Sequence, residues 1–302
     1  MSMNRRGVIE AIGVGGLTVL AGCSSNSSDD QSEQVGEEPD EETPDEETPD
    51  EETPDEETPD EEAEFEFVEW NVPSEVELNE EFDLRVVVAN TGGKAGDFTA
   101  PLYERTPESD WLKVSELDFE TIPPDTQTEV SLPVVYAYIN RYELRLGNFE
   151  QTTVLQTVSA QIDWGGKYIT PSGYVIRADE PELQDSYEYE GFTGELSQKE
   201  PDSGGQWVFV NMYVKNETGQ VEYSPSNFAL VTGNSQYDSE IILAFDPINQ
   251  GDEFEGGELQ PGIERSGWIA YQIPSNISVS DLTLAWSETT FNGEIVVNWG
   301  SG

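Results

Sequence analysis

The side chains that could take part in chemistry are unevenly represented in this sequence. It contains no histidine and one cysteine, whereas 63 acidic residues stand against 13 basic ones, for a formal charge of −50. Without histidine the chain lacks the usual general base near neutral pH and the commonest metal ligand, and a serine triad cannot form. One cysteine excludes an internal disulfide and a thiolate zinc cluster. The negative charge excludes nucleic acid as a partner, because binding it requires a Lys/Arg footprint.

Carboxylates are the remaining groups with catalytic or metal-binding chemistry. Pairs such as Asp179 with Glu180 and Asp252 with Glu253 could serve a glycosidase or bind calcium. Chance pairs are certain among so many carboxylates, and these lack the Asp-x-Asp-x-Asp-Gly spacing of a calcium loop. The sequence also lacks a phosphate loop, a nucleophile elbow and a dinucleotide fingerprint. We therefore predict a protein that is not an enzyme and needs no cofactor, and calcium binding stays an open alternative.

The single cysteine, Cys23, is placed for lipid attachment. Arg5 and Arg6 precede an apolar, glycine-rich run, and residues 20–23 read Leu-Ala-Gly-Cys. A basic start, a short apolar stretch and small residues at its end indicate a signal peptide over residues 1–22, and paired arginines favour the twin-arginine export route. The tetrapeptide resembles the lipobox of bacterial and archaeal lipoproteins, which implies cleavage before Cys23 and diacylglyceryl attachment to its sulfur. The alternative is a short membrane helix with a chance cysteine.

Residues 23–64 are expected to be a spacer. They form a low-complexity acidic segment whose centre repeats Thr-Pro-Asp-Glu-Glu. Because proline blocks regular ladders, like charges repel and almost nothing can be buried, we expect a disordered linker. At about 3.1 Å per residue, a polyproline-like chain of about forty residues reaches on the order of 120 Å. A lipid anchor followed by an extended linker predicts that the folded part stands away from the membrane surface, on the extracellular side of the cell membrane.

From residue 65 the pattern changes to short runs in which apolar and polar residues alternate. Leu84, Val86 and Val88 share one face of a run whose other face carries Asp83 and Arg85. A period of two indicates half-buried β-strands. About seven strands are expected, at 65–70, 82–90, 97–104, 111–119, 128–135, 141–147 and 152–159, and that number favours an immunoglobulin-like β-sandwich over residues 65–160. The stretch resembles the adhesion-type immunoglobulin-like domains of archaeal and bacterial surfaces, in which a strand ending Asn-Thr-Gly precedes a hairpin.

Residues 161–302 contain a second set of strand patterns. A valine-rich run ends in Asn-Glu-Thr-Gly, a phenylalanine-led run starts at Phe228, and a Pro-Gly turn precedes a run that ends in proline. This order is similar to the telokin-like, immunoprotective-type extracellular immunoglobulin family of unknown function, many of whose members are secreted lipoproteins. The resemblance implies a β-sandwich outside the cell and no known reaction. The predicted fold is thus all-β, with two immunoglobulin-like β-sandwich domains, 65–160 and 161–302, after the signal peptide and the disordered acidic linker.

Aromatic residues are the candidate binding residues, because flat rings on a solvent face stack on sugars or fill a partner's pocket. Both faces of the run 206–215 are apolar or aromatic, so one face is expected to be only partly covered. The candidates are Trp207, Phe209 and Tyr213 on this run, and Tyr187, Tyr189 and Phe192 on an expected loop. The alternative is that these rings pack in a core or between domains.

Three asparagines fit the Asn-x-Ser/Thr acceptor of N-glycosylation. Asn216 and Asn276 fall at expected strand ends, where loops are exposed, and Asn26 lies close to the predicted anchor. The alternative is that these asparagines serve turns.

Two functions fit these patterns. The first is a membrane-anchored, non-catalytic surface module that binds a protein or a glycan, and the second is a structural envelope component or spacer. Solute receptors of uptake systems are also lipid-anchored, but they are α/β proteins, and nothing here alternates strand with helix. Residues 65–302 carry 41 acidic against 11 basic residues, a net charge of about −30. An acidic surface of this extent, with few lysines, predicts a halophilic and archaeal source.

Overall fold

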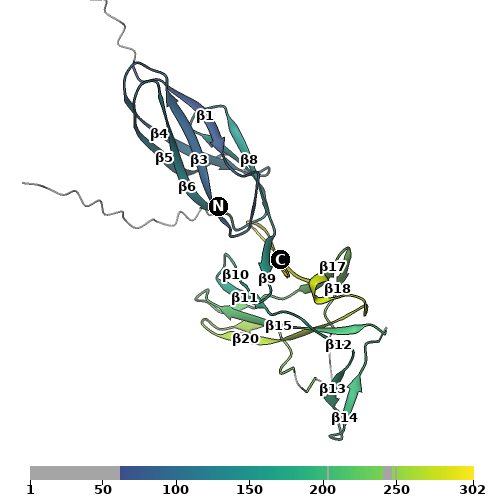
Figure 1. The fold of residues 1–302 in the computed structure, drawn as a ribbon. Coiled ribbons are helices and arrows are strands. Elements are labelled where there is room, and N and C mark those ends of the chain that lie inside the picture. The colour runs from purple at the N-terminus through teal and green to yellow at the C-terminus, as the bar shows by residue number, and fades with distance from the viewer. Residues whose placement is uncertain (1–61, 203, 241–246, 249) are drawn as a thin grey trace, which may run out of the picture.

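A computed structural model of the chain describes residues 62–202, 204–240, 247–248 and 250–302 (Figure 1). This part is all-β, which confirms the predicted fold class, and its regular structure consists of 22 strands and one short 3-10 helix, η1 (Val279–Asp281). Within the described residues, no helix has the length and apolar character needed to cross a membrane. The predicted signal peptide and residues 23–61 of the predicted linker lie outside the described residues.

The first half consists of two sheets. The three-stranded sheet has the order β1-β3-β6, and the five-stranded sheet has the order β2-β8-β7-β4-β5, with β2 parallel to β8 and the other neighbours antiparallel. The strands are β1 (Phe65–Asn71), β2 (Glu75–Glu77), β3 (Glu81–Asn90), β4 (Gly96–Arg105), β5 (Leu112–Ile122), β6 (Thr126–Val135), β7 (Arg141–Leu146) and β8 (Thr152–Val158).

Apolar residues from both sheets form the core of the first half. In β7, Tyr142, Leu144 and Leu146 are buried, whereas the two residues between them are half-buried, as the period of two predicts. Leu84 of β3 belongs to the same core. Seven strands were predicted here and the structure has eight, because β2 is a three-residue strand too short to show an alternating pattern.

The second half also contains two main sheets. One has the order β10-β11-β15-β12, with β20 also paired to β15, and the other has the order β18-β17-β21-β22-β9; β13 pairs with β14 and β16 with β19. The strands are β9 (Ala160–Asp163), β10 (Lys167–Ile169), β11 (Tyr174–Ala178), β12 (Glu182–Gln184), β13 (Tyr187–Glu190), β14 (Leu196–Lys199), β15 (Gln206–Asn216), β16 (Glu222–Tyr223), β17 (Phe228–Thr232), β18 (Ser235–Tyr237), β19 (Glu258–Leu259), β20 (Glu264–Ile273), β21 (Thr283–Thr290) and β22 (Gly293–Gly300).

The two halves lie end to end, and the hairpin β13–β14 projects at the far end of the second half (Figure 1). The core of the second half also takes in two residues of the first half, Leu78 and Tyr138, with Ile139 packed against it. The halves therefore share apolar contacts at their junction and are not simply tethered.

Each half closes the turn after its central strand with one buried asparagine, Asn90 or Asn216. In both, the side-chain oxygen accepts a hydrogen bond from the backbone N–H two residues later, and the side-chain nitrogen donates to the carbonyl four residues later. The nitrogen also donates to the carbonyl of Ile122 in the first half (2.9 Å) and of Leu259 in the second (2.7 Å). In each of these asparagine corners two hydrogen bonds close the turn and one connects it to a distant strand, and the Asn90 side-chain oxygen also accepts from the Glu64 N–H (3.2 Å).

Candidate functional site

Three of the six aromatic residues predicted to bind a partner are buried. Trp207 is 2%, Phe209 1% and Tyr187 5% exposed. The prediction that these rings are available on a surface is therefore wrong, and the alternative of core packing holds for them.

The physical reason is that both faces of β15 are covered. Trp207 and Phe209 pack with Trp268, Ala270 and Tyr187 in a separate aromatic cluster. The centroids of the Tyr187 and Trp207 rings are 5.2 Å apart and those of Phe209 and Trp268 are 5.6 Å apart, both edge to face. Tyr187 of the hairpin strand β13 packs on this face, and Trp268 and Ala270 of the neighbouring strand β20 complete the cluster.

The other three predicted residues are distributed over different elements. Tyr213 is half-buried under the Arg177 guanidinium, 5.0 Å from its ring centroid, and its hydroxyl donates to Glu264 (2.5 Å). Tyr189 is half-buried on β13, and Phe192 is 91% exposed in the turn between β13 and β14. The structure does not gather the six candidates into one aromatic surface.

Asn216 is wrongly predicted as a glycosylation site. Its side-chain nitrogen is the atom that would carry the glycan, and it is buried with both of its hydrogen bonds made to backbone carbonyls. Asn276 is exposed in the loop between β20 and η1, so it stays a prediction that peptide mapping of native material tests. Arg5, Arg6, Cys23 and Asn26 lie outside the described residues.

The two halves are joined where the tip of the β21–β22 hairpin meets the segment before β7. The Ile139 N–H donates to the carbonyl of Glu294 (2.8 Å), and the Asn292 side chain donates to the Tyr138 hydroxyl (3.4 Å). Gly293 has φ of 146°, and a Cβ there would lie 3.0 Å from the Tyr138 Cβ. Only glycine satisfies both the backbone angle and this close approach without displacement.

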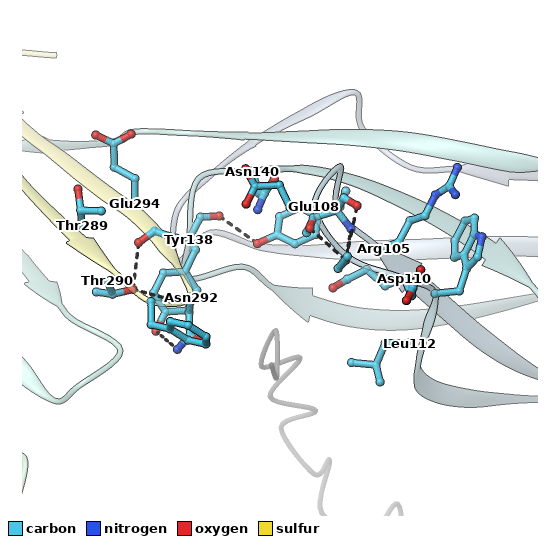
Figure 2. A pocket seen from close by; sticks show the side chains of 17 residues that line it. Arg105, Glu108, Asp110, Leu112, Tyr138, Asn140, Thr289, Thr290, Asn292 and Glu294 are labelled. Carbon is cyan, nitrogen blue, oxygen red and sulfur yellow. Dashed lines mark hydrogen bonds between the residues drawn. The ribbon is translucent and has the colours of Figure 1, made fainter. Parts of the chain in front are cut away.

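A cleft with a volume of about 640 Å³ opens at this junction (Figure 2). The end of β4 and the loop after it, residues 104–112, form one wall, and residues 289–294 of the β21–β22 hairpin form the other. Tyr138, Asn140 and Tyr142 lie between the walls. Because the walls come from different halves, the cleft exists only when both halves are docked.

Glu104 is the one buried carboxylate of this cleft. It is 5% exposed, and its carboxylate accepts a hydrogen bond from the Tyr136 hydroxyl (2.7 Å). Burial raises the pKa of Glu104 above its ordinary value, and the hydrogen bond from Tyr136 opposes this. No Lys or Arg of the described residues forms an ion pair with Glu104. The adjacent Arg105 is instead paired to Glu143 (2.6 Å). The cleft thus has a desolvated carboxylate without a compensating cation.

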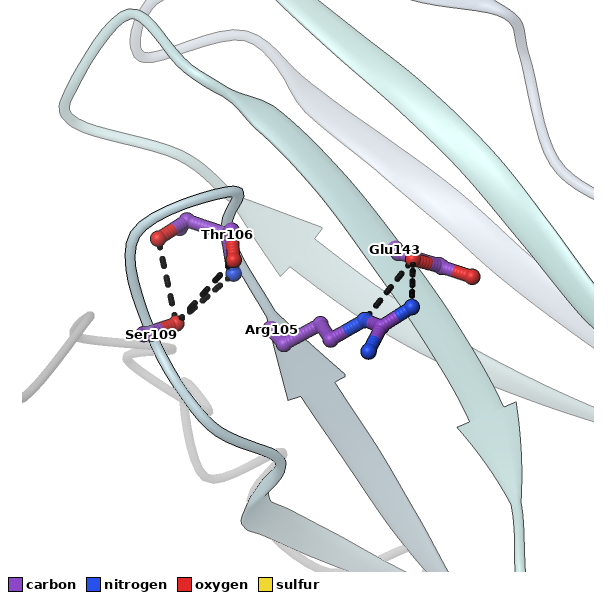
Figure 3. Close-up of polar contacts among 4 residues, drawn as sticks. All are labelled: Arg105, Thr106, Ser109 and Glu143. Atoms are coloured by element: carbon purple, nitrogen blue, oxygen red, sulfur yellow. Dashed lines mark hydrogen bonds and ion pairs between the residues drawn. The ribbon is translucent and has the colours of Figure 1, made fainter.

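The loop wall is held in place by contacts of its own, as Figure 3 shows. The Thr106 N–H and hydroxyl lie 2.8 and 3.0 Å from the Ser109 hydroxyl oxygen. Trp111, at the end of the loop, packs against the guanidinium groups of Arg105 and Arg145, 4.5 and 4.6 Å from its ring. These contacts fix the loop over the outer side of β4 and β7, so this wall is preorganised.

The lining of the cleft is polar and mostly acidic. Carboxylates of Glu104, Glu108, Asp110 and Glu294 line it, with hydroxyl, amide and phenol groups and the paired Arg105. Among the described residues, no group of three or more His, Cys, Asp or Glu side chains is placed to hold a metal ion. The negative potential of this lining favours a positively charged group over an anion.

Sequence reasoning did not identify this site, although one signal for it was present. On β4, Ala100 and Leu102 are buried, and Glu104 continues the same inward-facing series. A carboxylate at an inward position of a strand indicates either a buried partner or a site. Residues 289–294 gave no such signal, because their role depends on where the hairpin meets the other half.

Comparisons with known proteins give one family match. Residues 186–295 match a family described as a domain of unknown function (DUF4352). No curated protein shows significant similarity to the chain. Among solved structures, an uncharacterized β-sandwich protein from Clostridium difficile 630 is similar with 14% sequence identity and a TM-score of 0.30, covering 47% of this chain and 94% of that one. The residues of the cleft wall 104–112 lie outside the matched family segment.

Proposed function

We propose that this chain is an exported lipoprotein, anchored at the extracellular face of the membrane through Cys23, and that it acts as a non-catalytic binding module for a surface protein or a glycan. The junction cleft is its binding site. The observation that supports binding most is that both halves contribute a wall to one cleft, around a buried carboxylate that has no cation partner among the described residues. Preorganised walls lower the ordering cost of association.

The anchoring part of the proposal rests on the sequence. The pair Arg5-Arg6, an apolar run and a lipobox-like tetrapeptide ending in Cys23 occur in the order that an exported lipoprotein requires. Intact mass measurement of the membrane fraction is expected to give a mature chain that begins at Cys23 and carries a lipid. A soluble chain with an uncleaved N-terminus would refute the anchor. Replacing both arginines with lysine is expected to stop export, and unchanged export would remove the twin-arginine route.

A structural spacer is the competing function, and the end-to-end arrangement of the halves favours it (Figure 1). A spacer requires length and solubility but no occupied cleft. Binding at the junction cleft therefore separates the two functions.

Photo-crosslinking from the cleft tests the binding function. Phe291 lines the cleft and is 71% exposed, and Tyr223 on β16 is an aromatic residue of nearly equal exposure, 72%, outside the cleft. A photoreactive phenylalanine at either position of the full chain, expressed in its own membranes, reports what lies beside it. We expect a discrete crosslinked product from position 291 and none from position 223. The same products from both positions, or none from position 291, would favour the spacer.

A further inference from the structure

The base of the junction cleft combines a buried carboxylate with aromatic rings. Glu104 is 5% exposed, and Tyr142 lines the same cleft with its ring stacked on Tyr136, the hydrogen-bond donor to Glu104, at a centroid distance of 4.1 Å. The Tyr142 hydroxyl donates to the carbonyl of Tyr138 (3.2 Å), which fixes its ring. A carboxylate beside fixed aromatic rings is the chemistry that recognises an ammonium group, through an ion pair and cation–π attraction.

The excess of acidic over basic side chains in the lining also favours a bound cation. An ionised carboxylate that is desolvated and unpaired is costly, and a partner charge offsets that cost. Of the charged side chains in the lining, Arg105 is the single basic one, and it is paired to Glu143 through two contacts of 2.6 and 2.8 Å (Figure 3). Because Arg105 is already paired to Glu143, a positive charge that offsets the Glu104 carboxylate has to come from a bound ligand.

We propose that the junction cleft binds an alkylammonium group, the side chain of a lysine on a protein partner, with its charge against the Glu104 carboxylate. This inference rests on the proposed binding function and names its ligand class. Glu104 lies at the end of β4 with little of its side chain exposed, so the entering group is slim and carries its charge at the tip. A lysine side chain has this form, since its ammonium sits on a flexible four-carbon stem. An amino sugar carries its ammonium directly on a broad ring.

Ligand-observed NMR titration of the purified full chain tests this proposal. The probe is blocked lysine (Nα-acetyl-lysine amide), and blocked norleucine supplies a similar stem without the charge. In 1 M KCl the Debye length is about 3 Å, so binding that persists there reflects direct contact with the carboxylate. We expect saturable binding of blocked lysine and none of blocked norleucine. Equal binding of both compounds would overturn the proposal.

Two variants locate the bound charge, each with a matched control. Glu104→Gln removes the buried charge, and Glu222→Gln removes an exposed charge outside the cleft. Thr289→Lys places a tethered ammonium on the exposed cleft wall, and Thr193→Lys makes the same change in the β13–β14 turn. We expect Glu104→Gln and Thr289→Lys to weaken binding of blocked lysine at least tenfold and the controls to bind as the unchanged chain does. If Glu104→Gln does not fold, Thr289→Lys decides, because it alters only an exposed residue.

The remaining outcomes are distinct from failure of the proposed function. Undiminished lysine binding by Glu104→Gln or Thr289→Lys would overturn the ammonium site. Glucosamine binding that is tighter than lysine binding and equally sensitive to both variants would overturn the lysine assignment in favour of a glycan. A crosslink from position 291 without binding of blocked lysine would retain the binding function and remove its ligand class.

Discussion

Glu104 is a carboxylate at a position of β4 whose side chain faces the core, because it continues the inward-facing series of Ala100 and Leu102. Burial raises its pKa, so in the pH range between its unfolded and folded pKa values the folded chain holds a proton that the unfolded chain has released. The stability from this group is complete below the unfolded pKa, which is about 4.3 for glutamate, and is lost as the pH rises through the folded pKa. The raised pKa of Glu104 therefore lowers the stability of the empty protein as the pH rises above the unfolded pKa.

The substitution Glu104→Gln tests this linkage. We expect the melting temperature of the variant, relative to the unchanged chain, to increase from pH 4 to pH 8, because the variant has no charge to bury. Glu222→Gln, an exposed position, is expected to show no such trend. The measurement is thermal melting by circular dichroism in 1 M KCl, where surface carboxylates are largely screened. A difference that stays constant between the two pH values would contradict the raised pKa of the buried carboxylate.

The asparagine corners act at the scale of elements, because each connects the turn after a central strand to a second strand. We expect Asn90→Ala and Asn216→Ala each to lower the free energy of unfolding by about 2–4 kcal/mol, since each change removes at least three hydrogen bonds and leaves backbone carbonyls unpaired. Asn276→Ala, at an exposed asparagine, is expected to change it by less than about 0.5 kcal/mol. Urea denaturation measures all three. Equal small effects would show that the corners are incidental.

The alternation of buried and exposed residues along a single strand was predictable from the sequence, whereas the elements that pack against that strand were not. The period of two along β3 and β7 predicted their core faces, because burial of one strand face is a local pattern. The two apolar faces of β15 predicted a partly open surface, but Tyr187 of β13 packs on the second face together with Trp268 of the neighbouring strand β20. The cleft was missed for the same reason, since it forms where loops of both halves meet.

The whole molecule carries a large excess of negative charge. Residues 65–302 carry about −30, and among ion pairs between described residues only Arg105 with Glu143 joins two strands. The other pairs join residues two or three positions apart and therefore hold no elements together. Exposed pairs of this kind contribute little to stability. Self-repulsion of the acidic surface opposes the compact state in dilute buffer.

Salt is therefore expected to stabilise the folded protein. Raising KCl from 0.1 M to 1 M shortens the Debye length from about 10 Å to about 3 Å, which screens neighbouring carboxylates from one another. We expect the melting temperature of the full chain, followed by circular dichroism, to rise steeply between 0.1 M and 3 M KCl. A melting temperature that is flat or falls over this range would show that the acidic surface is not an adaptation to brine.

We propose that an occupant binds between the two halves of this protein. Amide hydrogen exchange of the full chain in its own membranes is compared with that of the purified, empty chain. This measurement detects an occupant of any chemical class. We expect slower exchange in the membranes at both cleft walls, residues 104–112 and 289–294, and unchanged exchange in the exposed turn 191–194 of the β13–β14 hairpin. Unchanged exchange at both walls, or protection confined to the hairpin turn, would contradict the claim.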